Sequence, residues 1–107
     1  MIEREQISLL PSEPGVYIMR DASENVVYVG KAIDIQKRVR SHCSYRDGRL
    51  ASPFVEEVDK VDYVITDTDS EAFLLEYNLI KRHEPRYNVK LKDDKRYPYL
   101  KITVQEA

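Results

Sequence analysis

The segment from Pro14 to Ala32, PGVYIMRDASENVVYVGKA, constrains the fold of this chain more than any other stretch. It reads almost the same from both ends, with Gly15-Val16-Tyr17 near its start and the reverse order, Tyr28-Val29-Gly30, near its end. Two runs of β-branched and aromatic residues flank polar turn formers, and this pattern predicts a β-hairpin. The mirrored order has two explanations: a hairpin that closes for structural reasons, or one that brings two phenol hydroxyls together for chemistry.

The tyrosines and glycines of this hairpin carry different information. Ideal alternation places Tyr17 and Tyr28 opposite each other, with Gly15 and Gly30 leaving space beside them. An aromatic cross-strand pair explains the two tyrosines without any function. It does not explain the glycines, because glycine within a strand often marks the close approach of a ligand or another backbone.

The remaining pattern predicts an α+β fold, a small and mostly antiparallel sheet flanked by helices. Asp34 is a plausible N-cap for a short helix, and Ser52-Pro53 resembles the start of another. The longest helix is predicted to begin near Thr68 and to end before Pro85. In chain order we expect strands at 16–19 and 26–29, a helix from 35, a loop at 44–51, a helix at 53–58, a strand at 61–66, a helix to about residue 83 and a last strand at 100–104.

Length and composition indicate one cytoplasmic domain spanning residues 1–107. No apolar run approaches the ~20 residues that span a bilayer, and no signal-peptide pattern opens the chain. The single cysteine, Cys43, cannot form an internal disulfide, which suits a reducing compartment. Two histidines and the lack of a CxxC motif argue against a zinc site of the usual kind.

The net charge of −2 conceals an uneven distribution. Residues 31–49 hold six basic side chains against two acidic ones, and residues 81–101 hold eight against three. Between them, residues 56–76 hold eight acidic side chains against one basic one. Two readings stay open: a face that binds a polyanion with an acidic back, or an ordinary solvated mixed surface.

Glu76 interrupts the apolar stripe of the longest helix. It falls four residues after Ala72 and four before Ile80, so the three share one helix face. Burying an unpaired carboxylate is costly. Glu76 must therefore snorkel to the rim, pair with a cation, bind a metal ion or lie at the edge of a cleft.

These residues together resemble a known family. The tripeptides ending at Tyr17 and beginning at Tyr28 resemble the paired signature of the GIY-YIG nucleases, with valine in both middle positions. Lys31-Ala32, Arg38, Glu76 in LLEYNLIK and Asn88 in PRYNVKLKDDKRYPY extend the match over essentially the whole chain. The pattern is most similar to the N-terminal endonuclease domains of the UvrC-type excinucleases. Proteins of that type are much longer, so we expect the chain to be one domain of a longer protein.

The resemblance implies a set of site residues. The expected catalytic group comprises Tyr17, Tyr28, Arg38, Glu76 and Lys31, and the expected substrate-binding group comprises His42, Asn88, Lys37 and Arg40. Glu76 is the expected ligand of one Mg²⁺ or Mn²⁺ ion. One departure stands out, because His42 stands where related domains often carry a tyrosine.

The implied function is metal-dependent hydrolysis of a DNA phosphodiester, the 3′ incision beside a lesion in nucleotide excision repair. UvrB, with UvrA upstream, is the expected partner through the full-length protein, and the domain alone is expected to be a monomer. Either Tyr17 or Tyr28 is a candidate to orient or deprotonate the water. Two alternatives stay open: another structure-selective GIY-YIG nuclease, and a non-catalytic nucleic-acid-binding module.

Overall fold

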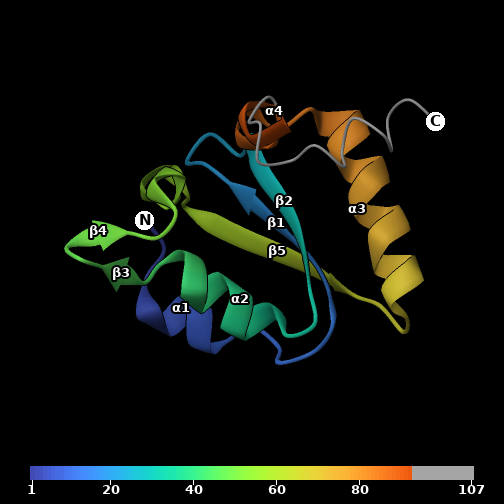
Figure 1. The fold of residues 1–107 in the computed structure, drawn as a ribbon, viewed down its shortest axis with the longest axis horizontal. Helices are drawn as coiled ribbons and strands as arrows, with labels where there is room; N and C mark the ends of the chain where they lie inside the picture. Colours follow the sequence, from blue (N-terminus) through green and yellow to red (C-terminus); the bar gives the residue numbers. More distant parts are fainter. Residues whose placement is uncertain (93–107) are drawn as a thin grey trace.

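A computed structural model describes residues 1–92 of the chain, and Figure 1 shows their arrangement. The elements in chain order are α1 (Arg4–Ser8), β1 (Gly15–Arg20), β2 (Val26–Ala32), α2 (Ile35–His42), β3 (Tyr45–Arg46), β4 (Arg49–Leu50), the 3₁₀ helix η1 (Pro53–Glu57), β5 (Lys60–Ile65), α3 (Asp69–His83) and α4 (Arg86–Lys92). The α+β class is confirmed. The last strand expected at 100–104 lies outside the described residues.

A three-stranded antiparallel sheet in the order β2-β1-β5 forms the centre of the molecule. On one face the buried cluster includes Tyr17, Met19, Ile35 and Val39, so α2 covers this side together with α1 and η1. On the other face Val16 and its neighbours pack against α3 (Figure 1). The central strand β1 is thus buried on both sides, and its side chains can be positioned firmly.

Two of the expected helix starts are confirmed by their caps. The Asp34 side chain accepts a hydrogen bond from the Lys37 amide at 2.9 Å and begins α2. The Thr68 hydroxyl accepts from the Glu71 amide at 3.0 Å and begins α3. At the other end of α3, Glu84 adopts a left-handed conformation with φ 43°, and this residue ends the helix before Pro85.

Other expectations are wrong in detail. Residues 53–57 form a 3₁₀ helix, and Ser52 makes no capping hydrogen bond with its side chain. The stretch expected to be a loop contains a small hairpin, β3–β4, with Asp47 and Gly48 at its turn. The helices α1 and α4 were not anticipated, because each is too short to show an apolar period.

The register of the main hairpin also differs from the expected one. Tyr17 lies opposite Gly30, and Tyr28 lies opposite Met19, so the two tyrosines are diagonal neighbours rather than a direct pair. A bulge between Met19 and Arg20 shifts the pairing near the turn.

Among residues 1–92, no helix combines the length and the apolar character that crossing a bilayer requires.

Candidate active site

The strand β1 places the Tyr17 ring directly across from Gly30 of β2. A Cβ atom built on Gly30 would overlap the Cζ and hydroxyl oxygen of Tyr17. Any side chain at this position would therefore displace a tyrosine that is only 1% exposed. The Tyr17 ring lies over the Cα atom of residue 30, so this position has no room for a side chain. This explains one of the two mirrored glycines.

Tyr28 belongs to a group of rings beside Tyr17. Its ring centroid lies 6.1 Å from that of Tyr17 and 5.6 Å from that of His42. Phe54 of η1 packs against Tyr28 at 4.7 Å and stacks on Tyr87 of α4 at 5.2 Å. The two signature tyrosines are thus brought together in one group of rings that comes from five elements.

The Tyr17 hydroxyl belongs to a buried hydrogen-bonded chain. It lies 2.7 Å from Nε2 of His42, and Nδ1 of the same ring lies 2.6 Å from the Oγ atom of Ser52. The His42 side chain belongs to the last residue of α2 and is only 8% exposed. Sequence reasoning missed Ser52 because a serine before proline is also the usual start of a helix.

The tautomer of the neutral His42 ring decides the donors and acceptors of this chain. With its proton on Nδ1, the ring donates to Ser52 Oγ and accepts the Tyr17 O–H at Nε2. With its proton on Nε2, the ring donates to the Tyr17 oxygen and accepts the Ser52 hydroxyl at Nδ1. Arg38 acts on the Tyr17 side chain as a donor in either case.

Burial sets the protonation states of these two groups. It raises the pKa of Tyr17 well above its ordinary value, and Tyr28 adds to this effect, while Arg38 opposes it. Burial also lowers the pKa of His42 to about 4, with the charge of Arg38 acting in the same direction. Near neutral pH the pair is thus a phenol beside a neutral imidazole, and both pKa shifts keep the proton on the phenol.

Glu76 approaches the same site from α3. Its charge and that of Arg38 both act on the ionisation of the Tyr17 hydroxyl, beside which the Tyr28 ring also lies, so side chains from β1, β2, α2 and α3 converge there. Burial raises the pKa of Glu76, and the positive charge and backbone of Lys31 partly offset this. The Lys31 ammonium itself lies 3.1 Å from a carboxylate oxygen of Asp69.

The donor set around Glu76 fits one hard divalent ion. None of the four ion pairs among residues 1–92 includes Glu76, although its carboxylate is half-buried. The same residues contain no group of three or more His, Cys, Asp or Glu side chains arranged to hold a metal. A single carboxylate leaves most of an ion's coordination shell to water and to substrate oxygens, which magnesium and manganese accept readily.

Asn88 has a use that the sequence did not indicate. Its amide oxygen accepts from the Val29 N–H at 2.7 Å, and its amide nitrogen donates to the Val29 carbonyl at 2.9 Å. This pair of bonds fastens α4 to the outer edge of β2, one residue after Tyr28. The substrate contact expected of Asn88 stays a prediction, since one N–H of the amide is still available.

The expected substrate-binding cations lie on the exposed face of α2. Lys37 and Arg40 are exposed, as is Arg38 of the expected catalytic group, and Arg40 is hydrogen-bonded to Gln36 one turn earlier at 3.3 Å. A shallow depression of about 230 Å³ is lined by Asp34, Lys37, Arg38 and Ser41. Arg38 thus borders open space while it also contacts Tyr17, so it connects the surface to the buried chain.

The fold and the site together define a class of protein. Its members have a three-stranded antiparallel sheet, and an arginine and a glutamate lie near the two tyrosines of the central hairpin. The family model described as "UvrC-like GIY-YIG domain" matches residues 13–89. The chain belongs to the UvrC-like GIY-YIG domain family.

Curated relatives and solved structures agree with this assignment. The chain is 53% identical over 104 residues to the UvrABC system protein C of Natronomonas pharaonis, covering 97% of this chain and 18% of that protein. It is 51% identical over 102 residues to the UvrABC system protein C of Moorella thermoacetica, covering 95% and 17% respectively. The chain therefore spans less than a fifth of the length of these two relatives.

A similar solved structure is the GIY-YIG N-terminal endonuclease domain of UvrC from Thermotoga maritima bound to its catalytic magnesium. The TM-score is 0.66 at 37% identity, over 78% of this chain and 92% of that one. Variants of that domain with one tyrosine replaced by phenylalanine have also been solved with the divalent cation bound.

Proposed function

We propose that this chain is an endonuclease domain that hydrolyses a DNA phosphodiester with one divalent ion. The observation that carries the proposal is the convergence at the Tyr17 hydroxyl of Arg38, Tyr28 and Glu76 from three other elements. A module that only binds a polyanion gains nothing from a half-buried carboxylate at that point. This favours a nuclease over the non-catalytic alternative.

Each predicted side chain has a chemical role in this proposal. Glu76 would hold the ion, which when bound supplies positive charge to the phosphate and lowers the pKa of a coordinated water. Arg38 presents a planar fork to a non-bridging phosphate oxygen. Lys31, beside Glu76, adds positive charge where the phosphate becomes more negative.

Tyr17 is the better candidate for the base, because its hydroxyl lies 2.7 Å from Nε2 of His42. Loss of the Tyr17 proton to that nitrogen would leave a phenolate able to take a proton from the attacking water. Burial and the charge of Arg38 both lower the pKa of His42, so pairing of Arg38 with a phosphate would remove part of that effect and make the transfer easier. Tyr28 would then orient the water or the phosphate from the same group of rings.

The setting of the reaction is also part of the proposal. The relatives are components of a UvrABC system, which supports the 3′ incision of nucleotide excision repair, with lesion recognition by UvrB and UvrA. We infer that residues 1–107 act as the endonuclease domain of such a cytoplasmic protein, and that the domain alone is a monomer. Another structure-selective GIY-YIG nuclease remains the alternative setting.

Replacement of Glu76 tests the metal-ligand role. Glu76→Gln keeps the size of the side chain, so we expect the fold to persist while Mn²⁺ binding and incision of damaged duplex with UvrA and UvrB are lost. Glu71→Gln on the exposed side of α3 removes the same charge and should leave both intact. Incision by Glu76→Gln near the unaltered rate would overturn the proposal.

A further inference from the structure

We propose that the β3–β4 hairpin is a separate binding site for DNA phosphates. Arg46 and Arg49 would bind phosphates of the DNA strand beside the cut. The inference rests on the proposed function, because it assigns part of the substrate's backbone to a surface outside the catalytic group. Neither arginine is within that group, and the hairpin projects beyond the C-terminal end of α2 (Figure 1).

The hairpin has a tight and well-defined turn. Asp47 and Gly48 have φ values of 53° and 78°, and a two-residue turn with both values positive matches the right-handed twist of paired strands. The turn fixes the register, in which Arg46 lies directly opposite Arg49 and Tyr45 opposite Leu50. Arg46 and Arg49 therefore flank the turn as a directly opposed pair of exposed residues.

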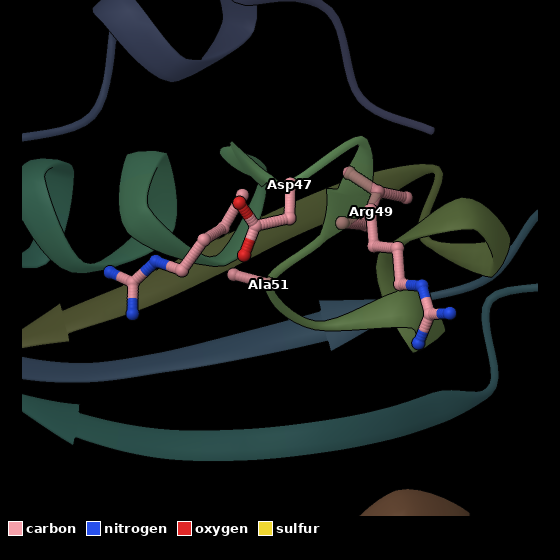
Figure 2. A pocket seen from close by; sticks show the side chains of 5 residues that line it. Asp47, Arg49 and Ala51 are labelled. Carbon is pink, nitrogen blue, oxygen red and sulfur yellow. The ribbon is translucent and has the colours of Figure 1, made fainter.

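The charge of this hairpin favours an anionic ligand. Both arginines are exposed, and neither belongs to an ion pair found within residues 1–92. Figure 2 shows the Arg49 guanidinium pointing away from the Asp47 carboxylate. A phosphate would supply the missing negative charge, and each planar guanidinium matches a phosphate in geometry.

The base of the hairpin is firmly attached at the active site. Leu50 packs against the main buried cluster, and the Ala51 N–H donates to the Ser44 carbonyl at 2.8 Å. The hairpin leaves α2 after His42 and returns to the chain at Ser52, the two residues that hold Tyr17 in its hydrogen-bonded chain. A shallow hollow of about 520 Å³ on this element is lined by Arg46, Asp47, Arg49, Leu50 and Ala51 (Figure 2).

The dimensions suit a backbone that continues from the cleaved phosphate. Two residues of strand, Tyr45 and Arg46, separate Ser44 from the turn, a reach of about 7 Å. One strand of duplex DNA rises 3.4 Å per nucleotide, so this reach corresponds to about two nucleotides. The arginines would thus contact phosphates a few nucleotides from the cut, and they would read no sequence.

The salt dependence of DNA binding tests the assignment. The chain, the double variant Arg46→Gln/Arg49→Gln and the charge-matched variant Arg4→Gln/Arg82→Gln would be titrated with a short labelled duplex in EDTA. Each phosphate contact contributes about 0.9 to the slope of log K against log salt. We expect the hairpin variant to lose about 1.8 from that slope and at least about tenfold in affinity at 0.1 M salt, whereas the control keeps both.

A second readout separates binding from folding. Because both arginines are exposed and belong to no ion pair found within residues 1–92, the melting temperature of the hairpin variant should match that of the unaltered chain. An unchanged slope, or equal losses in both variants, would overturn the proposal and assign the hairpin to an acidic protein surface or to solvent. Since EDTA removes the metal, such a failure is distinct from failure of the nuclease assignment, which the Glu76→Gln incision assay decides.

Discussion

The hydroxyl of Tyr17 lies 2.7 Å from Nε2 of His42, inside the molecule rather than at its surface. This contact joins the central strand β1 to the end of α2, and Ser52 extends it at 2.6 Å on the other side of the ring. A residue that the sequence presents as a departure from its family is therefore hydrogen-bonded to a signature tyrosine. The contact gives the two signature tyrosines unequal roles.

The inequality can be measured by removing one hydroxyl at a time. Tyr17→Phe keeps the ring over Gly30 and deletes the group that contacts His42 and Arg38, so incision should fall by about 10²–10⁴. The free energy of unfolding should change by about 1 kcal/mol, the net value of a hydrogen bond. Tyr28→Phe is the matched variant and should lose less. Full activity in both variants would show that the two tyrosines of the β1–β2 hairpin have a purely structural role.

Ser52 is expected to act as a positioning residue, through the tautomer of His42. Ser52→Ala removes the acceptor for the Nδ1 proton, and the ring can then also populate the form with its proton on Nε2, which cannot accept from Tyr17. We expect about tenfold slower incision and a shift of the His42 ring ¹⁵N resonances toward a mixture of tautomers. Ser52→Thr keeps a hydroxyl and should restore both.

Unchanged ¹⁵N resonances in Ser52→Ala would contradict this role even if activity fell. In that case the loss would come from repacking of η1, the 3₁₀ helix that follows Ser52 and carries Phe54 against Tyr28. The two readouts therefore separate an effect on the imidazole from an effect on its surroundings.

Local signals allowed much of the fold to be predicted from sequence. The caps Asp34 and Thr68 form hydrogen bonds at the expected helix starts, because a cap depends only on residues within one turn. Asp47-Gly48 is an equally local signal of the β3–β4 hairpin, although the polar stretch around it resembles a loop. The short helices α1 and α4 gave no comparable signal, since helices of this length depend mainly on tertiary packing.

The residues of the site could be predicted from the sequence, but their arrangement in space could not. The family resemblance assigned Tyr17, Arg38 and Glu76 to one site, and the structure brings them together. The register that puts Gly30 rather than Tyr28 opposite Tyr17 depends on strand pairing and on a bulge, which alternation alone cannot locate. The bond between His42 and Ser52 joins residues ten positions apart, and no pattern in the sequence specifies it.

The buried His42 should make stability depend on pH. Its pKa is lowered from 6.5 to about 4 in the folded chain, so the unfolded chain binds more protons between these values. Stability is then fully present above pH 6.5 and is lost as the pH falls toward 4, by on the order of 3 kcal/mol. Denaturant unfolding at several pH values measures this loss directly.

His42→Gln should flatten that dependence, because glutamine does not titrate. His83→Gln is the matched control, since His83 is exposed at the end of α3 and its replacement should leave the slope unchanged. A His42→Gln variant that still loses stability as steeply between pH 6.5 and 4 would show that His42 is not buried in its neutral form.

The mirrored glycine of β2 gives a last prediction. Gly30→Ala places a methyl group where the Cζ and hydroxyl of Tyr17 now lie, and the ring is too buried to move aside without disturbing the cluster. We expect a loss of about 1–3 kcal/mol in the free energy of unfolding, the usual cost of overpacking. Incision should fall further than this loss of stability explains, because the Tyr17 hydroxyl would lose its contact with His42.

Gly48→Ala is a useful comparison, since a Cβ there meets nothing within 4 Å and only the positive φ of 78° disfavours a side chain. That variant should lose stability while the contact between Tyr17 and His42 is kept. If Gly30→Ala instead kept the unaltered stability and rate, the approach of Tyr17 to Gly30 would not be the reason for the glycine.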